Sequence, residues 1–149
     1  MEFNMIHGLV YLSDAVCSIS HQELSHILAT STKNNKIHGV TGFLYFNDYQ
    51  FIQYIEGEIA NLNSVYEKIQ QDSRHEIKCS IHDLTFSTHL MPKWQMQLFD
   101  TSYHSPQIFG QVLLNMTQFL TNQTQLTDTE IKKATSSMLY RLSRHLNQH

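Results

Sequence analysis

The spacing of hydrophobic and polar residues changes several times along the chain, and residues 50–57 (QFIQYIEG) are the most informative stretch. Successive side chains of a strand point to opposite faces, so Phe51, Gln53 and Ile55 share one face. Gln53 therefore lies between two apolar neighbours. On a covered face, an amide without hydrogen-bond partners costs on the order of 1–3 kcal/mol. Either a core group or the polar edge of a ligand must satisfy it.

Runs of strand-forming residues predict five strands in the first hundred residues. These strands are expected at residues 8–13, 40–46, 50–57, 78–87 and 94–99. Asn47 and Asp48 supply a turn between the second and third strands, which makes these two a hairpin. Pro92 marks a loop before the last strand.

Two apolar stripes with helical spacing separate these strands. Ser20 and Glu23 have a capping-box spacing, and the helix that they begin is predicted to reach about Thr32. The polar run 33–36 would end it, because asparagine tolerates left-handed backbone angles. A second helix is predicted to end near Gln71. The stripes consist of Leu24, Ile27 and Leu28, and of Leu62, Val65, Tyr66 and Ile69.

This order of elements is βαββαββ and predicts an α+β fold with a ferredoxin-like sheet. In such a sheet the first and third strands are neighbours, and both helices cover one face. Tyr11 and Gln53 would then lie side by side on central strands and face the helices. The expected adjacency joins a phenol to the amide that needs a partner.

The last third of the chain predicts two amphipathic helices. Ser105 and Pro106 form a helix start, and Thr127 begins a second capping box. We therefore divide the chain into a domain of residues 1–100 and a two-helix extension of residues 101–149. The apolar positions are Ile108, Val112, Leu113, Met116, Phe119 and Leu120, then Ile131, Ala134, Met138, Leu139, Leu142 and Leu146. Each stripe must pack on the sheet, on the other helix or on a partner.

Composition narrows the classes of function. The 149 residues are 41% hydrophobic and 15% charged, which is typical of a globular protein rather than a disordered or fibrous one. The formal net charge is -3 and there is no run of Lys or Arg, so direct nucleic-acid binding is not expected. Cys17 and Cys79 are isolated, no membrane span or signal peptide is recognisable, and a cytoplasmic location is expected.

Neither a metal centre nor a hydrolase is expected. Among the ten histidines only His145 and His149 have ligand-like spacing, and no cysteine or carboxylate pattern joins them. Glu56 and Glu58 could imitate an acid/base pair, but no second feature supports one.

A flat aromatic cofactor needs apolar groups on both ring faces and amides along its polar edge. The candidates are Ile27 and Ile69 for the faces, Asn34, Asn35 and Gln53 for the edge, and Arg74 with Lys68 for a phosphate. Each candidate also has an ordinary structural interpretation, because isoleucines fill cores, asparagines end helices and a core amide can bond to the backbone. These residues alone do not identify the ligand.

Six short motifs follow one another in a characteristic order. They are LVYLS at 9–13, NN at 34–35, GVTG at 39–42, FIQYIEGE at 51–58, DSRH at 72–75 and WQM at 94–96. Together they resemble the BLUF domain, a flavin-binding blue-light sensor, over about residues 8–99. The trailing helices are similar to those of short family members that have no enzymatic output domain.

The resemblance implies a non-covalently bound flavin between the two helices, usually FAD, with FMN as an alternative. Tyr11 matches the tyrosine that passes an electron and then a proton to the excited flavin. Gln53 matches the glutamine that reorients or tautomerises between that tyrosine and the ring, which shifts the absorption to the red. Trp94 and Met96, which alternation places on one face, match a pair that reports the switch outward.

The remaining matches concern flavin binding. Asn35 with Asn34 matches the polar-edge amide, Ile27 and Ile69 match the stacking positions, and Lys68, Asp72, Arg74 and His75 match positions near the ring edge or the ribityl and phosphate chain. We therefore expect a light-driven switch, not an enzyme, that acts on a downstream transcriptional or signalling regulator, with homo-oligomer formation left open. The alternatives are a ferredoxin-like binding or small-enzyme domain without photochemistry, and an oligomerisation module.

Overall fold

The computed structural model describes residues 5–47, 49–100, 115–116, 118–122 and 125–146. The chain forms two compact units, residues 1–102 and 103–149. The predicted helix start at Ser105 and Pro106, and the stripe positions Ile108, Val112 and Leu113, lie outside the described residues.

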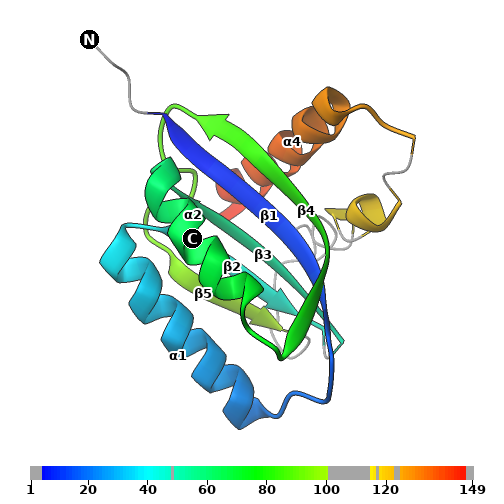
Figure 1. Cartoon of the computed structure of the whole chain (residues 1–149). Coiled ribbons are helices and arrows are strands. Elements are labelled where there is room, and N and C mark those ends of the chain that lie inside the picture. Colours follow the sequence, from blue (N-terminus) through cyan, green and yellow to red (C-terminus); the bar gives the residue numbers. More distant parts are fainter. Residues whose placement is uncertain (1–4, 48, 101–114, 117, 123–124, 147–149) are drawn as a thin grey trace. The chain divides into compact units, whose positions relative to one another are not determined.

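The first unit is a five-stranded sheet in the order β4-β1-β3-β2-β5. Its elements are β1 (Ile6–Ala15), α1 (His21–His38), β2 (Thr41–Phe46), β3 (Gln50–Gly57), α2 (Ile59–Gln70), β4 (His75–Phe86) and β5 (Gln95–Asp100). Among the described strand pairs, β2 and β5 are parallel and the other three pairs are antiparallel. Figure 1 shows α1 and α2 on the same face of the sheet. The predicted ferredoxin-like βαββαββ fold is confirmed.

The alternation of side chains along β1 and β3 places the core. Leu9 on β1, Leu44 on β2 and Ile55 on β3 pack with Leu24 of α1 and Val65 of α2 in one buried cluster. Tyr11 is paired with Gln53 across β1 and β3, so the predicted adjacency of these two residues is confirmed. Directly opposed residues of antiparallel strands project to the same face, and this pairing brings the phenol and the amide together.

Helix α1 is longer than predicted and ends at His38, not near Thr32. Gly39 caps it in the left-handed conformation with φ 65°, and its N–H donates to the carbonyl oxygens of Asn35 and Lys36. Glycine adopts this conformation without the Cβ penalty, so it ends the helix here in place of the asparagines. The extra helical residues carry Asn35 onto the buried side of α1.

Gly42 permits the close approach of β2 to β3. Its φ is 154°, and a Cβ at this position would lie 1.9 Å from the carbonyl oxygen of Tyr54. The Gly42 N–H also donates to the carbonyl oxygen of Trp94 at 2.8 Å, which joins β2 to the start of β5. A side chain at residue 42 would therefore push two strands apart.

We expect Gly42→Ala to lower the free energy of unfolding by about 3 kcal/mol or more, because the clash is with backbone and cannot be relieved by a rotamer change. Urea unfolding of the purified chain measures this. Gly39→Ala is the matched control: nothing lies within 4 Å of its added Cβ, so only the left-handed φ is penalised, by about 1 kcal/mol. Equal losses in the two variants would contradict the close-approach argument.

Strand β5 is irregular at Met96, and this corrects the prediction that Trp94 and Met96 share a face. Gly42 pairs with Gln95 but Phe43 pairs with Gln97, so Met96 is an extra residue with φ 116°. Such a bulge breaks the alternation of side chains. Met96 belongs to the core cluster under the helices, whereas the Trp94 ring lies 5.3 Å from that of Phe99.

The Phe43 ring contacts the rings of both Phe99 and Tyr54. These three rings lie on the sheet face opposite to Gln53. Trp94 therefore contacts the face opposite to the one that holds Met96.

The second unit contains helical residues 115–116 and 118–121 and helix α4 (Asp128–Leu146). The capping box is present, since Glu130 N donates to Thr127 Oγ1 and Thr127 N donates to Glu130 Oε1, both at 3.2 Å. Hydrogen bonds from Thr127 lower the pKa of Glu130. Of the two histidines with ligand-like spacing, His145 and His149, the second lies outside the described residues. None of the helices in the described ranges has the length and hydropathy of a membrane span.

Candidate functional site

Three buried side chains form a hydrogen-bonded line beneath the helices. The Tyr11 hydroxyl on β1 donates to Gln53 Oε1 on β3 at 2.6 Å. Gln53 Nε2 donates in turn to Met96 Sδ on β5 at 3.3 Å. Gln53 is only 3% exposed, so the amide between two apolar neighbours has found partners on both sides. The line connects three of the five strands at their helix-covered face.

Burial raises the pKa of the Tyr11 phenol far above its ordinary value, and the nearby Tyr66 and Asp72 add to the effect. The phenol is therefore protonated at any physiological pH. A proton can leave this group only when another change makes it much more acidic.

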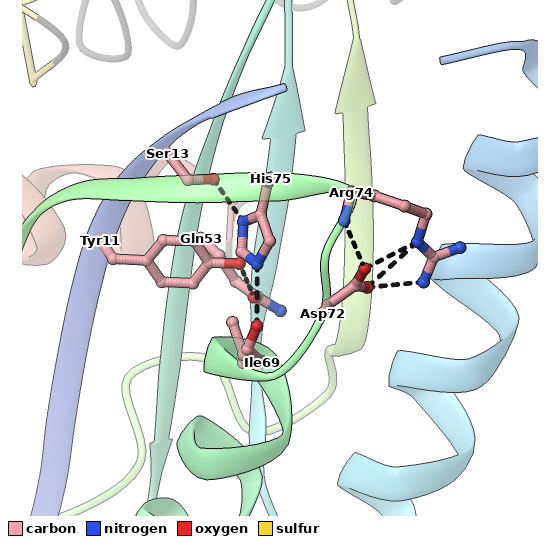
Figure 2. A network of polar contacts seen from close by, with 7 residues as sticks. All are labelled: Tyr11, Ser13, Gln53, Ile69, Asp72, Arg74 and His75. Atoms are coloured by element: carbon pink, nitrogen blue, oxygen red, sulfur yellow. Dashed lines mark hydrogen bonds and ion pairs between the residues drawn. The ribbon is translucent and has the colours of Figure 1, made fainter. Parts of the chain in front are cut away.

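His75 fixes the surroundings of Tyr11. Its Nε2 lies 2.8 Å from the carbonyl oxygen of Ile69, and because a carbonyl only accepts, Nε2 carries a hydrogen. Its Nδ1 lies 2.7 Å from Ser13 Oγ on β1. Figure 2 shows the imidazole beside the phenol, with ring centroids 5.8 Å apart. His75 thus ties the end of α2 and the start of β4 to β1 next to the Tyr11 ring.

Asp72 and Arg74 form an ion pair on the turn between α2 and β4 (Figure 2). Arg74 Nη2 lies 2.6 Å from Asp72 Oδ2, and Arg74 Nε donates to Oδ1 at 2.9 Å. Hydrogen bonding to Arg74 lowers the pKa of Asp72, and the same bonds raise the pKa of Arg74. Both side chains are about a third exposed, so solvent screening limits the pair to at most about 1 kcal/mol. The pair shapes the rim of the site more than it stabilises the fold.

Two adjoining cavities lie at this site, with empty volumes of about 380 and 520 Å³ that include space open to solvent. They share the wall residues Ile27, Ser31, Gln53, Ile69, Asp72 and Arg74. The first reaches Tyr11 and His75, and the second reaches Asn34, Asn35 and Lys68. The structure therefore brings together every residue that the sequence proposed for cofactor binding, and Tyr11 as well. Trp94 does not line these two cavities, and Met96 meets the site through Gln53.

Five residues that line the cavities were not predicted from the sequence to do so. They are Thr30 and Ser31 on α1, Leu44 on β2, Phe51 on β3 and Val65 on α2. Residues three, four and seven apart share a helix face. Thr30 and Ser31 could therefore have been found from Ile27 and Asn34. The strand residues are ordinary core positions with no local signal of a cavity.

The donor set fits a flat ligand with a polar edge. Asn35 is 1% exposed, and its Nδ2 has no hydrogen-bond partner among the described residues. An unpaired buried donor costs about 1–3 kcal/mol, so a ligand acceptor in the neighbouring cavity would relieve it. Ile27 from α1 and Ile69 from α2 offer apolar surfaces on the walls of the same cavity. These groups match the two faces and the amide-binding edge of a flavin ring.

Comparison with known proteins agrees with this geometry. Residues 6–97 match the family model of the BLUF domain, described as sensors of blue light using FAD. The photoactivated adenylate cyclase subunit beta of Euglena longa is 35% identical over 74 residues, which are 50% of this chain and 9% of that protein. Its counterpart in Euglena gracilis is 30% identical over 89 residues, 59% of this chain and 10% of that protein. This chain thus matches about a tenth of the length of these relatives.

Solved structures share the fold. BlsA in its photo-activated state has 26% identity and a TM-score of 0.61, covering 91% of this chain and 95% of that one. A bacterial light-regulated adenylyl cyclase has 29% identity and a TM-score of 0.64, covering 76% of this chain and 34% of that one. BlrB, a BLUF protein in its dark state, has 19% identity and a TM-score of 0.63 over 95% of this chain and 96% of that one.

The family model covers more than half of the chain, and the cavity between α1 and α2 has the groups that a flavin needs. The chain belongs to the BLUF family and is a flavin-binding sensor of blue light, with FAD as the chromophore of the family.

Proposed function

We propose that Tyr11 is the electron and proton donor of the light reaction and that Gln53 is its switch. The observation that carries this proposal is the buried line from Tyr11 through Gln53 to Met96. A bound flavin would supply light absorption and, when excited, a strong one-electron oxidant. Tyr11 would give an electron to that oxidant, its phenol would become strongly acidic, and the proton would move toward Gln53 Oε1, 2.6 Å away. The electron and the proton would both return to Tyr11 afterwards.

Gln53 can hold two arrangements because its amide accepts through oxygen and donates through nitrogen. In the structure its oxygen faces Tyr11 and its nitrogen faces Met96. A rotated amide would turn its nitrogen toward Tyr11 and its oxygen toward the Met96 sulfur, which has no hydrogen to donate. The Gln53–Met96 hydrogen bond therefore exists in one arrangement of the Gln53 amide and is lost in the other, so Met96 responds to the switch.

We further propose that the flavin lies between α1 and α2. Ile27 and Ile69 would cover the two ring faces, with Asn35 at the polar edge and Asn34 beside it. Lys68 and Arg74 would hold anionic groups of the ribityl phosphate chain. Asp72 would orient Arg74 through the bidentate pair, and His75 would hold the Tyr11 ring and the end of α2 in place. The support is that these side chains line the same two cavities.

Output would pass through Met96 and Trp94 at the start of β5 to a downstream protein, a transcriptional or signalling regulator, without substrate turnover by this chain. We place the flavin-binding sensor domain at residues 1–100 and a two-helix extension at 101–149, which is supported by the division into compact units at residue 102. A cytoplasmic location is supported by Cys17 and Cys79, which do not form a disulfide with each other. The proposal of a downstream partner is supported by relatives named photoactivated adenylate cyclases, which this chain matches over about a tenth of their length.

The test of the light reaction is a light-minus-dark absorption spectrum of the purified chain reconstituted with FAD. We expect the flavin band to shift to the red under blue light and to return in the dark, because the rearranged Gln53 makes a new hydrogen bond to the ring edge. A chain that binds FAD but shows no reversible shift would contradict the proposal and favour a ferredoxin-like binding domain without photochemistry.

We expect Asn35→Leu to weaken FAD binding by about 10- to 100-fold, the loss of one or two hydrogen bonds to a buried ligand. The free energy of unfolding of the flavin-free variant should not fall, since the replaced donor has no partner among the described residues. Fluorescence titration and urea unfolding measure the two quantities. Asn63→Leu, at an exposed asparagine of α2 that lines neither cavity, is the control and should change affinity by less than about threefold.

A further inference from the structure

Glu56 is a fully buried carboxylate on the face of β3 opposite Gln53. It is 0% exposed, and the strand alternation that turns Gln53 toward the helices turns Glu56 away from them. A buried carboxylate is unfavourable unless hydrogen-bond donors replace the water that it has lost. The identity of those donors therefore shows what the residue holds together.

The donors come from three separate segments. Glu56 Oε1 accepts from the Tyr54 hydroxyl and from the backbone N–H of Leu90, both at 2.8 Å. Glu56 Oε2 accepts from Thr41 Oγ1 at 2.7 Å and from the backbone N–H of Met91 at 2.9 Å. The two backbone groups belong to the connection between β4 and β5. One side chain thus binds this connection to β2 and β3.

His89 extends the same contact. The Thr41 hydroxyl has one hydrogen, which it gives to Glu56, so it accepts from His89 Nδ1 at 2.9 Å. His89 Nδ1 then carries a hydrogen and also lies 3.3 Å from Glu56 Oε2. We call Glu56, Thr41, Tyr54 and His89 with the bound 90–91 backbone the Glu56 clamp.

The clamp lies directly before the irregular part of β5. Trp94 N donates to the Met91 carbonyl at 3.2 Å, and the Trp94 carbonyl accepts from Gly42 N at 2.8 Å. Two residues later Met96 has φ 116°, a conformation that costs on the order of 1–3 kcal/mol for a residue other than glycine. Such a conformation persists only when its surroundings hold it. Gln53 bonds the Met96 sulfur on one side, and the clamp fixes the chain on the other.

We propose that Glu56 is a positioning residue of the light switch. It anchors residues 90–91, so that a rearrangement of the Gln53–Met96 hydrogen bond alters the conformation of β5. Without the anchor the bulge would relax, and the Met96 contact would no longer differ between dark and light. This inference rests on the proposed role of Gln53. Glu56 lines neither cavity of the flavin site and its hydrogen-bond partners do not include Tyr11, so the clamp and the photochemistry can be separated by mutation.

The test is amide hydrogen exchange of the full flavin-bound chain, in the dark and under blue light, together with the absorption spectrum. In Glu56→Gln an amide nitrogen replaces one carboxylate oxygen and cannot accept from its backbone N–H. We expect a red shift of normal size, exchange at residues 90–96 about tenfold faster in the dark, and a light-induced change there at least threefold smaller. Glu58→Gln, an exposed carboxylate two residues away, is the matched control and should behave as the wild type.

Thr41→Val is a second variant, which keeps the carboxylate and removes one hydroxyl donor with its link to His89. If Glu56→Gln does not fold, Thr41→Val decides, and it should also reduce the light-induced change at 90–96. A wild-type-sized light-induced change at 90–96 in the decisive variant would overturn the inference and leave the photochemistry standing. Absence of the red shift in the wild type would instead overturn the proposed function.

Discussion

Gln53→Leu is expected to abolish the light-induced red shift while FAD stays bound. Leucine has nearly the same volume but can neither accept from Tyr11 nor donate to Met96, so both hydrogen bonds of the buried line are lost. No second arrangement remains for light to select. The light-minus-dark spectrum should be flat within noise, and an FAD titration should give an affinity within about tenfold of the wild type.

Gln50→Leu is the control on the same strand. Gln50 is half-buried, bonds to Asp14 across the sheet and lies outside the flavin cavities, so its loss should leave the red shift intact. A normal, reversible red shift in Gln53→Leu would disprove the assigned switch. Gln53→Ala serves as a check on side-chain volume and should give the same flat spectrum.

Tyr11→Phe is expected to remove the red shift as completely, for a different reason. The phenylalanine ring keeps the packing but has no proton to give, and it is much harder to oxidise than a phenol. Gln53 Oε1 also loses its donor, so the free energy of unfolding should fall by about 1 kcal/mol. Absorption under continuous blue light measures the first effect, and urea unfolding of the flavin-free chain measures the second.

Tyr66→Phe tests whether a neighbouring tyrosine, and not Tyr11, is the electron and proton donor. Tyr66 is buried on α2, and its ring centroid lies 6.2 Å from that of Tyr11. It makes no hydrogen bond to Gln53 in the structure, so the variant should retain the red shift. If Tyr66→Phe lost the red shift and Tyr11→Phe kept it, the electron and proton donor would be Tyr66 on α2 instead of Tyr11 on β1.

Much of the candidate site could be predicted because it depends on local spacing and on topology. Period-two alternation puts Phe51, Gln53 and Ile55 on one face of β3, and the βαββαββ order makes β1 its neighbour, which predicts the pairing of Tyr11 with Gln53. Ile27 on α1 and Ile69 on α2 followed from the helical stripes and from the family motifs. The identity of the ligand came from the motifs alone.

Other features could not be predicted, because the local pattern either offers two equivalent signals or carries none. The end of α1 was set by the left-handed Gly39, whereas the preceding asparagines carry the same local signal of a helix end. The separation of Trp94 from Met96 depends on one extra residue in the pairing of β5 with β2. A bulge leaves no mark in the hydrophobic pattern of a six-residue strand.

By itself the sequence determined the element order, the shared face of Phe51, Gln53 and Ile55, and the family resemblance, since these depend on residues close together in the chain. Only the tertiary structure decided which face of β3 the helices cover, that Asn35 carries a buried donor with no partner among the described residues, and that Glu56 holds residues 90–91. The physical reason is that a buried polar group is defined by its partners. Those of Glu56 stand up to 35 residues away, where no periodicity reaches.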